Sequence, residues 1–203
     1  MPKLPNSFYQ HEDVLELAVG LLGKQLFTCV NGKITGGIIV ETEAYNGVMD
    51  KASHAYGGRF TPRTATMYEA GGITYVYLCY GIHHLLNVVT GSKNNPQAVL
   101  IRGIQPVEGI TTMLARRNML ALAPRISAGP GSVAKALGVD RTLNAKDLLG
   151  DEIWIEDGSP IDANEIVSSP RVGVDYAGDH ALLPWRFYIK GNNYVSKPNK
   201  IFP

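Results

Sequence analysis

IIVETEAYNGVMDKASH, residues 38–54, is the stretch around which we expect the rest of the chain to be arranged. Its β-branched start predicts a strand that leads directly into Glu41, Glu43 and Tyr45. Side chains alternate along a strand, so the two carboxylates and the tyrosine share one face. Because apolar residues run in ahead of the acids, at least one carboxylate is expected inside the protein. Burial disfavours the charged form, so that acid needs a cation or hydrogen-bond donors nearby.

The end of this stretch predicts a change from strand to loop. Asn46-Gly47 breaks the strand, and a polar loop then leads to His54. An acid, an aromatic ring and a histidine that converge in this way indicate a functional site. The alternative is an edge strand with two solvated glutamates and a surface histidine.

Length and composition indicate one intracellular domain. The chain has 203 residues, 45% of them hydrophobic and 18% charged, which fits a single domain over residues 1–203. It contains no run of about 18 apolar residues, and its start lacks the pattern of a secretion signal. The only cysteines, Cys29 and Cys79, lie in apolar strand-like contexts, which argues against a disulfide framework or a zinc site. We therefore expect a cytoplasmic protein without a membrane span.

The near-neutral net charge of +1 hides an uneven distribution. Residues 51–135 carry nine basic and two acidic side chains, whereas residues 136–185 carry three basic and ten acidic ones. The basic segment directly follows the Glu/Tyr stretch, which indicates a surface that faces phosphate. The alternative is a mixed surface on which the two segments fold against each other.

The remaining pattern predicts a mixed α+β domain of mostly antiparallel strands. Asn31-Gly32 is a strong hairpin signal, and residues 49–67 are expected to form a loop. Helices are predicted over residues 11–23, 106–120 and 129–137, and further strands over 25–30, 74–80, 85–90, 98–104, 152–156 and 186–190. The chain has no dinucleotide glycine fingerprint, P-loop, HExxH or paired-cysteine motif, which excludes the chemistries that depend on them.

Tyrosines cluster in the segment TYVYLCY, residues 74–80. Tyr75 and Tyr77 share one strand face, and Tyr80 stands at the strand end beside Gly81. An aromatic ring on such a turn projects outward, in the way of side chains that wedge open base steps in a duplex. The alternative is core packing, because strands favour tyrosine.

Arg102 and Asn87 are polar residues in apolar strands. Arg102 follows Val99-Leu100-Ile101, and an arginine in such a setting is rarely buried unpaired. Glu41 or Glu43 could face it and hold a water between the two charges, or simply form a structural salt bridge. On local grounds Asn87 satisfies backbone groups.

The neighbouring histidines His83 and His84 could face phosphates. A metal site would need a third ligand, and none can be placed from the sequence.

Together these residues resemble the alkyladenine (3-methyladenine) DNA glycosylase family. Six motifs occur in the family's order and span about Leu15 to Ile189. They are VETEAY (Val40–Tyr45), DKASHAYGGRFTPR (Asp50–Arg63), YVYLCYGIHHLLNVV (Tyr75–Val89), AVLIRGIQP (Ala98–Pro106), GPG (Gly129–Gly131) and RVGVDYAG (Arg171–Gly178). The resemblance implies a single-domain α+β fold, with a curved antiparallel β-sheet and flanking helices. It also implies an excision-repair enzyme.

The resemblance implies a catalytic group of three residues. Glu43 matches the general base, and Arg102 matches the arginine that helps to hold the attacking water. A backbone carbonyl that matches Val172 holds the same water. Glu41 receives no catalytic role from the family.

Other positions match residues that contact the substrate and the DNA. Tyr45, His54 and Tyr77 match the residues that sandwich the flipped base. Asn87 matches the asparagine that crowds the 2-amino group of undamaged guanine. Tyr80 matches the tyrosine inserted into the minor groove.

Two arginines of the 49–67 loop are further candidates for DNA contact, and the sequence differs from the family's pattern at two places. Arg59 and Arg63, the charges of the 49–67 loop, are expected to contact DNA. Beside the wedge residue Tyr80, residues 82–84 stand at positions where the family's sequence pattern varies. The resemblance therefore does not specify which residues form the floor of the pocket. Ser132–Lys135 follows GPG where a lysine one residue after the motif is expected, so no DNA contact is assigned there.

The expected function is excision of alkylated purines from duplex DNA: 3-methyladenine, 7-methylguanine, and also hypoxanthine and ethenoadenine. A water activated by glutamate would do the hydrolysis, without metal or cofactor. No lysine is placed for a Schiff base, so we expect a monofunctional enzyme without lyase activity, acting as a monomer. The alternatives are a nucleic-acid-binding module without chemistry and a hydrolase of free nucleosides.

Overall fold

A long central strand, β2 (Lys33–Asn46), organises the sheet of the protein. The computed structural model describes residues 1–197, and the end of the predicted domain 1–203, residues 198–203, lies outside the described residues. Every paired strand is antiparallel, as predicted. The other strands are β1 (Gln25–Val30), β3 (Thr74–Cys79), β4 (His83–Thr90), β5 (Gln97–Glu108), β6 (Ile153–Glu156), β7 (Ile166–Ser169) and β8 (Arg186–Ile189).

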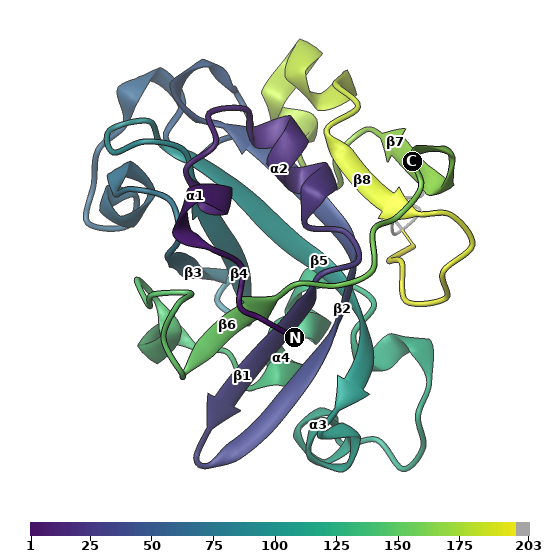
Figure 1. Cartoon of the computed structure of the whole chain (residues 1–203). Helices are drawn as coiled ribbons and strands as arrows, with labels where there is room; N and C mark the ends of the chain where they lie inside the picture. The colour runs from purple at the N-terminus through teal and green to yellow at the C-terminus, as the bar shows by residue number, and fades with distance from the viewer. Residues whose placement is uncertain (198–203) are drawn as a thin grey trace.

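Helices flank this twisted sheet. Figure 1 shows α1 and α2 in front of it and α4 behind it. The α-helices are α1 (Asn6–Tyr9), α2 (Val14–Gly20), α3 (Ile110–Arg117) and α4 (Pro130–Leu137). The 3-10 helices are Gly47–Met49, Tyr56–Gly58, Ala65–Tyr68, Pro124–Ile126, Arg141–Leu143, Ala163–Glu165 and Asp175–Leu182. The predicted fold, a single-domain α+β protein with a curved antiparallel sheet, is confirmed.

Along one edge of β2 the pairing partner changes from β1 to β8 near the middle of the strand. The main strand order is β3-β4-β5-β2-β1-β6, with β8 paired to both β2 and β7. One edge of β2 pairs with β1 over residues 33–38 and then with β8 over residues 41–43. The other edge pairs with β5, and this register is irregular on both sides of Glu41. Such an irregularity bends a strand, and here it lies beside the two acids.

Local signals explain several element boundaries. Asn31 and Gly32 both have positive φ (53° and 70°) and close the β1–β2 hairpin as predicted. α2 begins later than predicted because Asp13 caps it, accepting the N–H of Leu15 at 2.8 Å. Pro130 occupies the first turn of α4, as the GPG motif predicted.

Other boundaries depend on pairing across the sheet. The helix predicted over 106–120 is α3, residues 110–117 only. Residues 106–108 instead extend β5, since Pro106 and Glu108 pair with Gly37 and Gly36 of β2. Strand β7 and helix α1 were not predicted. β7 has no clear alternation and forms by pairing with β8.

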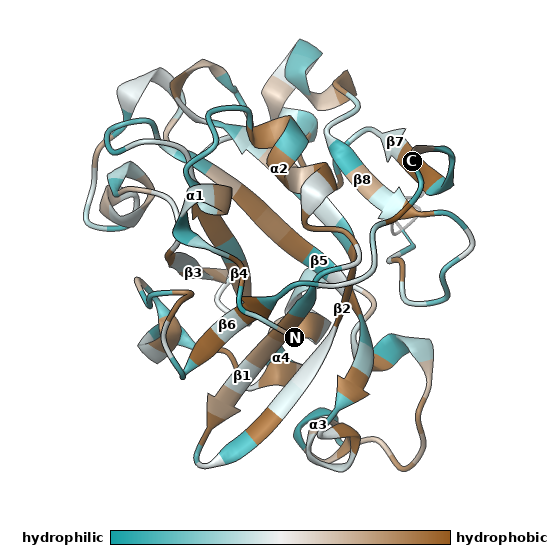
Figure 2. Cartoon of the chain, viewed as in Figure 1, coloured by the Kyte–Doolittle hydropathy of each residue, from teal (hydrophilic) through white to brown (hydrophobic). Residues whose placement is uncertain are grey.

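One main hydrophobic core lies between the sheet and its helices. Figure 2 shows the hydrophobic colour concentrated along β4 and β5. Buried residues of α2 and α4, including Leu17, Ala18, Val133 and Leu137, pack into this core with strand residues such as Ile101. Cys29 and Cys79 are partly buried free thiols. Within residues 1–197, no helix has the length and apolar character required to cross a membrane.

Candidate active site

A pocket of about 640 Å³ opens beside the β3–β4 hairpin. Eight of the predicted site residues line it: Tyr45, His54, Arg63, Tyr77, Tyr80, Asn87, Arg102 and Val172. The structure thus brings together residues from the four strands β2, β3, β4 and β5, from the tip of the β3–β4 hairpin, from the loop after β2 and from the segment before the 3-10 helix Asp175–Leu182. The volume lies in the range of small-molecule sites, roughly 300–1,000 Å³.

Glu43 lies directly behind the pocket wall and is fully buried. Its Oε1 accepts the backbone N–H of Val172 at 2.8 Å and lies 3.3 Å from Nη1 of Arg102. Its Oε2 accepts the hydroxyl of Tyr45 at 2.8 Å. Glu43 is not itself on the pocket surface, although all three of these partners are. The prediction that an acid of this strand lies inside is confirmed, and Glu41 is fully buried as well.

Arg102 connects the two acids. Its side chain is 7% exposed, its Nε donates to Oε1 of Glu41 at 3.0 Å, and its Nη2 donates to Oγ of Ser196 at 3.2 Å. Burial by itself would lower the pKa of Arg102, but the charges of Glu43 and Glu41 outweigh it and raise the pKa. The guanidinium therefore stays charged. The salt bridge considered from the sequence exists, and it is made mainly with Glu41.

Tyr45 forms one wall of the pocket and also touches the acid. Burial, followed by the charge of Glu43, raises the pKa of Tyr45 well above its usual value. The hydroxyl therefore remains protonated and can donate to Glu43. The guanidinium of Arg171 lies 4.9 Å from the centre of the Tyr45 ring and 5.0 Å from that of Trp185. Arg171 does not line the pocket, so it supports Tyr45 from behind.

His54, Tyr75 and Tyr77 form an aromatic wall. The ring of His54 lies 4.6 Å from that of Tyr77, at an angle of 76°. Nδ1 of His54 lies 2.9 Å from the hydroxyl of Tyr75, which orients the imidazole. Burial, and then the charges of Arg63 and Arg59, lower the pKa of His54 to about 4. His54 is therefore neutral at pH 7 and offers an uncharged ring face to the pocket.

Asn87 combines the two interpretations that the sequence left open. It is buried opposite Tyr75 in the β3–β4 pair, and its Nδ2 donates to the carbonyl of Tyr75 at 3.0 Å. The backbone role is thus present. Asn87 also lines the pocket, where this hydrogen bond fixes the position of its amide.

Tyr80 projects from the tip of the β3–β4 hairpin and is 87% exposed. Tyr80 and Gly81 both have positive φ (50° and 70°), and Ile82 N–H donates to the carbonyl of Cys79 at 3.0 Å. Two positive φ values at a hairpin tip are typical of a type I′ turn, and they are unusual for a tyrosine. The outward projection predicted from the sequence is confirmed. Ile82 is exposed on the same tip.

The two loop arginines are placed differently. Arg63 lies over the ring of Tyr77, 4.8 Å from its centre, at the edge of the pocket. Arg59 is exposed and does not line the pocket. The carbonyl of Arg59 accepts the hydroxyls of Thr64 at 3.0 Å and Tyr68 at 3.2 Å, which hold the loop in shape.

An ion pair beneath the pocket was missed from the sequence. Arg171 binds Asp50 through both Nη atoms, with 2.8 Å between Nη2 and Oδ1, and both side chains are fully buried. Nη1 of Arg171 also donates to the carbonyl of Ala44, between Glu43 and Tyr45 in the chain, at 2.9 Å. The pair thus joins the Val172 segment to the strand that carries the acid.

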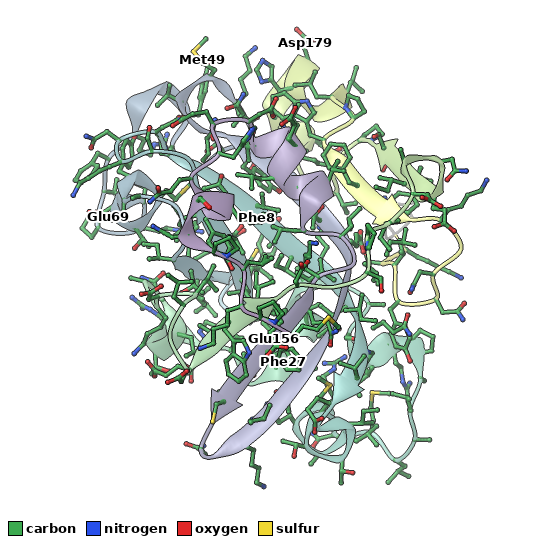
Figure 3. The ribbon with its side chains drawn as sticks, in the orientation of Figure 1. Phe8, Phe27, Met49, Glu69, Glu156 and Asp179 are labelled. Carbon is green, nitrogen blue, oxygen red and sulfur yellow. The ribbon has the colours of Figure 1, made fainter. Side chains whose placement is uncertain are left out.

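This pair lies where two distant segments pack together. Figure 3 shows Met49 and Asp179 projecting from these segments at the same end of the molecule. Lys51 N–H donates to Nδ1 of His180 at 3.3 Å, which joins the segments directly.

Tyr176 is a pocket residue that was also missed from the sequence. It lines the pocket, and its hydroxyl donates to the carbonyl of Ala52 at 3.1 Å. Both Asp50 and Arg171 stand inside recognised motifs, but no local signal showed that they pair.

The groups in the pocket and directly behind its wall include a guanidinium, aromatic rings and a carboxylate. Over residues 1–197, no group of three or more His, Cys, Asp or Glu side chains is placed to hold a metal ion. A buried acid beside a cation, behind a pocket walled by aromatic rings, can activate water next to a flat, electron-poor substrate.

Comparisons with known proteins agree on one family. The model of the methylpurine-DNA glycosylases matches residues 7–193. Three bacterial relatives carry the name "Putative 3-methyladenine DNA glycosylase". The protein of Chlamydia felis is 46% identical over 98% of this chain and 100% of its own length. That of Clostridium acetobutylicum is 46% identical (96% and 97% covered), and that of Desulfitobacterium hafniense 41% (97% and 99%).

Proposed function

The chain belongs to the methylpurine-DNA glycosylase family, and on that premise we propose that it excises alkylated purines from duplex DNA by hydrolysis. Its substrates are 3-methyladenine and 7-methylguanine, and also hypoxanthine and ethenoadenine. Residues 1–203 act as one glycosylase domain, as a monomer and without metal or cofactor. The observation that carries the proposal is the buried Glu43, held against Arg102 directly behind an aromatic pocket.

The substrate nucleotide has to leave the duplex before it can react. Extruding it costs a few kcal/mol because stacking and pairing are lost. Tyr80, exposed at the hairpin tip, fills the gap in the stack. Stacking of the base between Tyr45, His54 and Tyr77 offsets the loss by roughly 1–3 kcal/mol per base.

Access to Glu43 depends on Tyr45. The Tyr45 hydroxyl donates a hydrogen bond to Oε2 of Glu43. Stacking of the flipped base on Tyr45 breaks this hydrogen bond and opens Glu43 to a water. Arg102 and the carbonyl of Val172 hold that water. The Val172 N–H, already bonded to Oε1 at 2.8 Å, keeps the carboxylate oriented.

Hydrolysis then needs only the chain's own groups and water. Glu43 takes a proton from the water as its oxygen attacks the anomeric carbon. The glycosidic electron pair leaves with the base, so a cationic methylated purine departs neutral, whereas hypoxanthine or ethenoadenine departs as an anion that takes a proton from solvent. The negative charge of Glu43 stabilises the positive charge that develops on the sugar. No lysine of the described chain lines the pocket, which supports a monofunctional enzyme without strand cleavage.

Selectivity comes from charge and shape. N-alkylated purines carry positive charge, so they leave easily and bind electron-rich ring faces. His54, neutral at pH 7, does not repel them. Asn87, fixed by its bond to Tyr75, crowds the 2-amino group of undamaged guanine. Arg59 and Arg63 contact DNA phosphates beside the pocket.

The direct test uses duplexes that each carry one 7-methylguanine, hypoxanthine or ethenoadenine. We expect the free base to appear, and the strand to break only after alkali treatment of the abasic product. Strand cleavage without alkali would contradict the monofunctional mechanism. If the purified protein released no base from any of these duplexes, the proposed activity would be refuted.

Tyr80→Ser should weaken binding to a lesion-bearing duplex by about 10-fold, because the wedge contributes stacking worth roughly 1–3 kcal/mol. Hydrolysis of a free methylated nucleoside should change little, since no duplex has to be opened. Leu149→Ser, which truncates an exposed apolar residue outside the pocket, is the control. Equal losses on duplex and nucleoside would argue against the wedge and favour a nucleoside hydrolase.

A further inference from the structure

Glu41 has no part in the proposed chemistry, yet it is among the most strongly bonded side chains of the site. It is fully buried and accepts four hydrogen bonds. Its Oε1 accepts Nε of Arg102 at 3.0 Å, Nε of Arg186 at 2.7 Å and Oγ of Ser196 at 2.7 Å. Its Oε2 accepts the backbone N–H of Ser196 at 2.6 Å. An acid bonded in this way is fixed in both position and orientation.

The partners of Glu41 come from three separate parts of the chain. Arg102 lies on β5 and Arg186 on β8, and Ser196 follows β8 near the end of the described residues. Ser196 also binds both arginines: its Oγ accepts Nη2 of Arg102 at 3.2 Å, and its carbonyl accepts Nη2 of Arg186 at 2.8 Å. Ser196 thus closes the network over Glu41.

The close approach of this last segment depends on Gly103. A Cβ atom at Gly103 would lie 2.6 Å from the carbonyl oxygen of Tyr194 and 3.2 Å from Cβ of Glu41. Any other residue would push the segment away from the acid. A glycine beside Arg102 therefore lets the segment that ends at Ser196 pack directly over the active-site arginine.

These contacts fix the orientation of the Arg102 guanidinium. Two of its nitrogens, Nε and Nη2, are held by Glu41 and Ser196, and only Nη1 faces Glu43, at an ion-pair distance of 3.3 Å. Arginine and carboxylate prefer a bidentate pair with two parallel hydrogen bonds. If Arg102 were released from Glu41, it could turn and form such a pair with Glu43. That pair would occupy the oxygen that has to take a proton from water.

We propose that Glu41 and Ser196 act as positioning residues that hold Arg102 away from a bidentate pair with Glu43, and so keep Glu43 available as the base. This inference rests on the proposed function of Glu43. It gives Glu41, which lacks a catalytic role, a definite task in the same reaction. It also makes the segment around Ser196 part of the active-site architecture.

The test compares Ser196→Ala with Ser196→Thr, which keeps the hydroxyl. We expect Ser196→Ala to lower the single-turnover rate constant of base release by about 10-fold at saturating enzyme, the loss expected for an interaction needed only in the reaction step. The Kd for a duplex with a tetrahydrofuran abasic analogue should stay within about two-fold of the wild type. Ser196→Thr should recover most of the rate. Ser168→Ala, the same change at an exposed serine of β7, is the matched control.

Glu41→Gln provides a second variant, because it keeps the shape and removes the charge that holds Arg102. It should lower the rate constant at least as strongly as Ser196→Ala, again without a change in Kd. Wild-type rates in both variants would overturn the proposal. So would rate, Kd and thermal stability falling together without recovery in Ser196→Thr, since that pattern indicates a general structural role. If the wild type released no base at all, the proposed function would be the one that fails.

Discussion

Glu43→Gln should abolish base release while binding of the lesion-bearing duplex persists. Glutamine keeps the size of the side chain and an acceptor for the N–H of Val172, which lies 2.8 Å from Oε1. It carries no negative charge and cannot take a proton from water. General-base help contributes roughly 10²–10⁴ in rate, so the single-turnover rate constant should fall by at least about 100-fold.

The measurement pairs single-turnover base release with equilibrium binding to a duplex that carries the tetrahydrofuran analogue. Glu152→Gln, which changes an exposed glutamate paired with Lys146, is the matched control and should retain full activity. Base release at the wild-type rate by Glu43→Gln would remove Glu43 from the chemistry. If wild type and variant both bound the duplex but neither released a base, the chain would be a binding module instead.

Asp50→Ala should destabilise the protein by about 3–5 kcal/mol, the cost of leaving a buried charge without its partner. The partner is Arg171, whose side chain is fully buried and binds Asp50 through two nitrogens. Burial alone would lower the pKa of Arg171, but bonding to Asp50 raises it overall, so the residue cannot escape by losing its proton. Urea denaturation followed by circular dichroism gives the free energy of unfolding directly.

The control for this change is an exposed ion pair. Asp151 lies 2.7 Å from Lys3 with its side chain 99% exposed, so Asp151→Ala should leave the free energy of unfolding almost unchanged. A loss below about 1 kcal/mol for Asp50→Ala as well would show that Arg171 does not depend on Asp50. That result would also weaken the view that the pair anchors Val172 and the strand that carries Glu43.

Turn chemistry and alternation allowed much of this fold to be predicted. Asn31-Gly32 indicated a hairpin because both positions need positive φ, and the structure has it. Tyr80 beside Gly81 indicated a projecting ring for the same local reason. Apolar residues ahead of Glu43 indicated burial of the acid, and both acids of the strand are buried.

Predictions were wrong where pairing overrode local pattern. Residues 106–108 look like the start of a helix, but they continue β5 because β2 offers free backbone groups along its edge. The helix begins only after Gly109, which has a φ of 65°. Strand β7 has a weak pattern of its own and exists through its pairing with β8.

Glu41 and Glu43 show most clearly which properties follow from the local sequence and which depend on the tertiary structure. Residue types, strand alternation and family motifs were enough to place two acids on one strand face, because those properties depend on neighbours in the chain. Strand alternation alone could not separate the two acids, since they stand two positions apart in like surroundings, and only the resemblance to the family singled out Glu43. Packing separated them. Arg102, Arg186 and Ser196 bind Glu41 from 61 to 155 positions away, while Val172 meets Glu43 from 129 positions away. Contacts over such separations arise only when the sheet forms, so the different partners of the two acids became readable only in the folded chain.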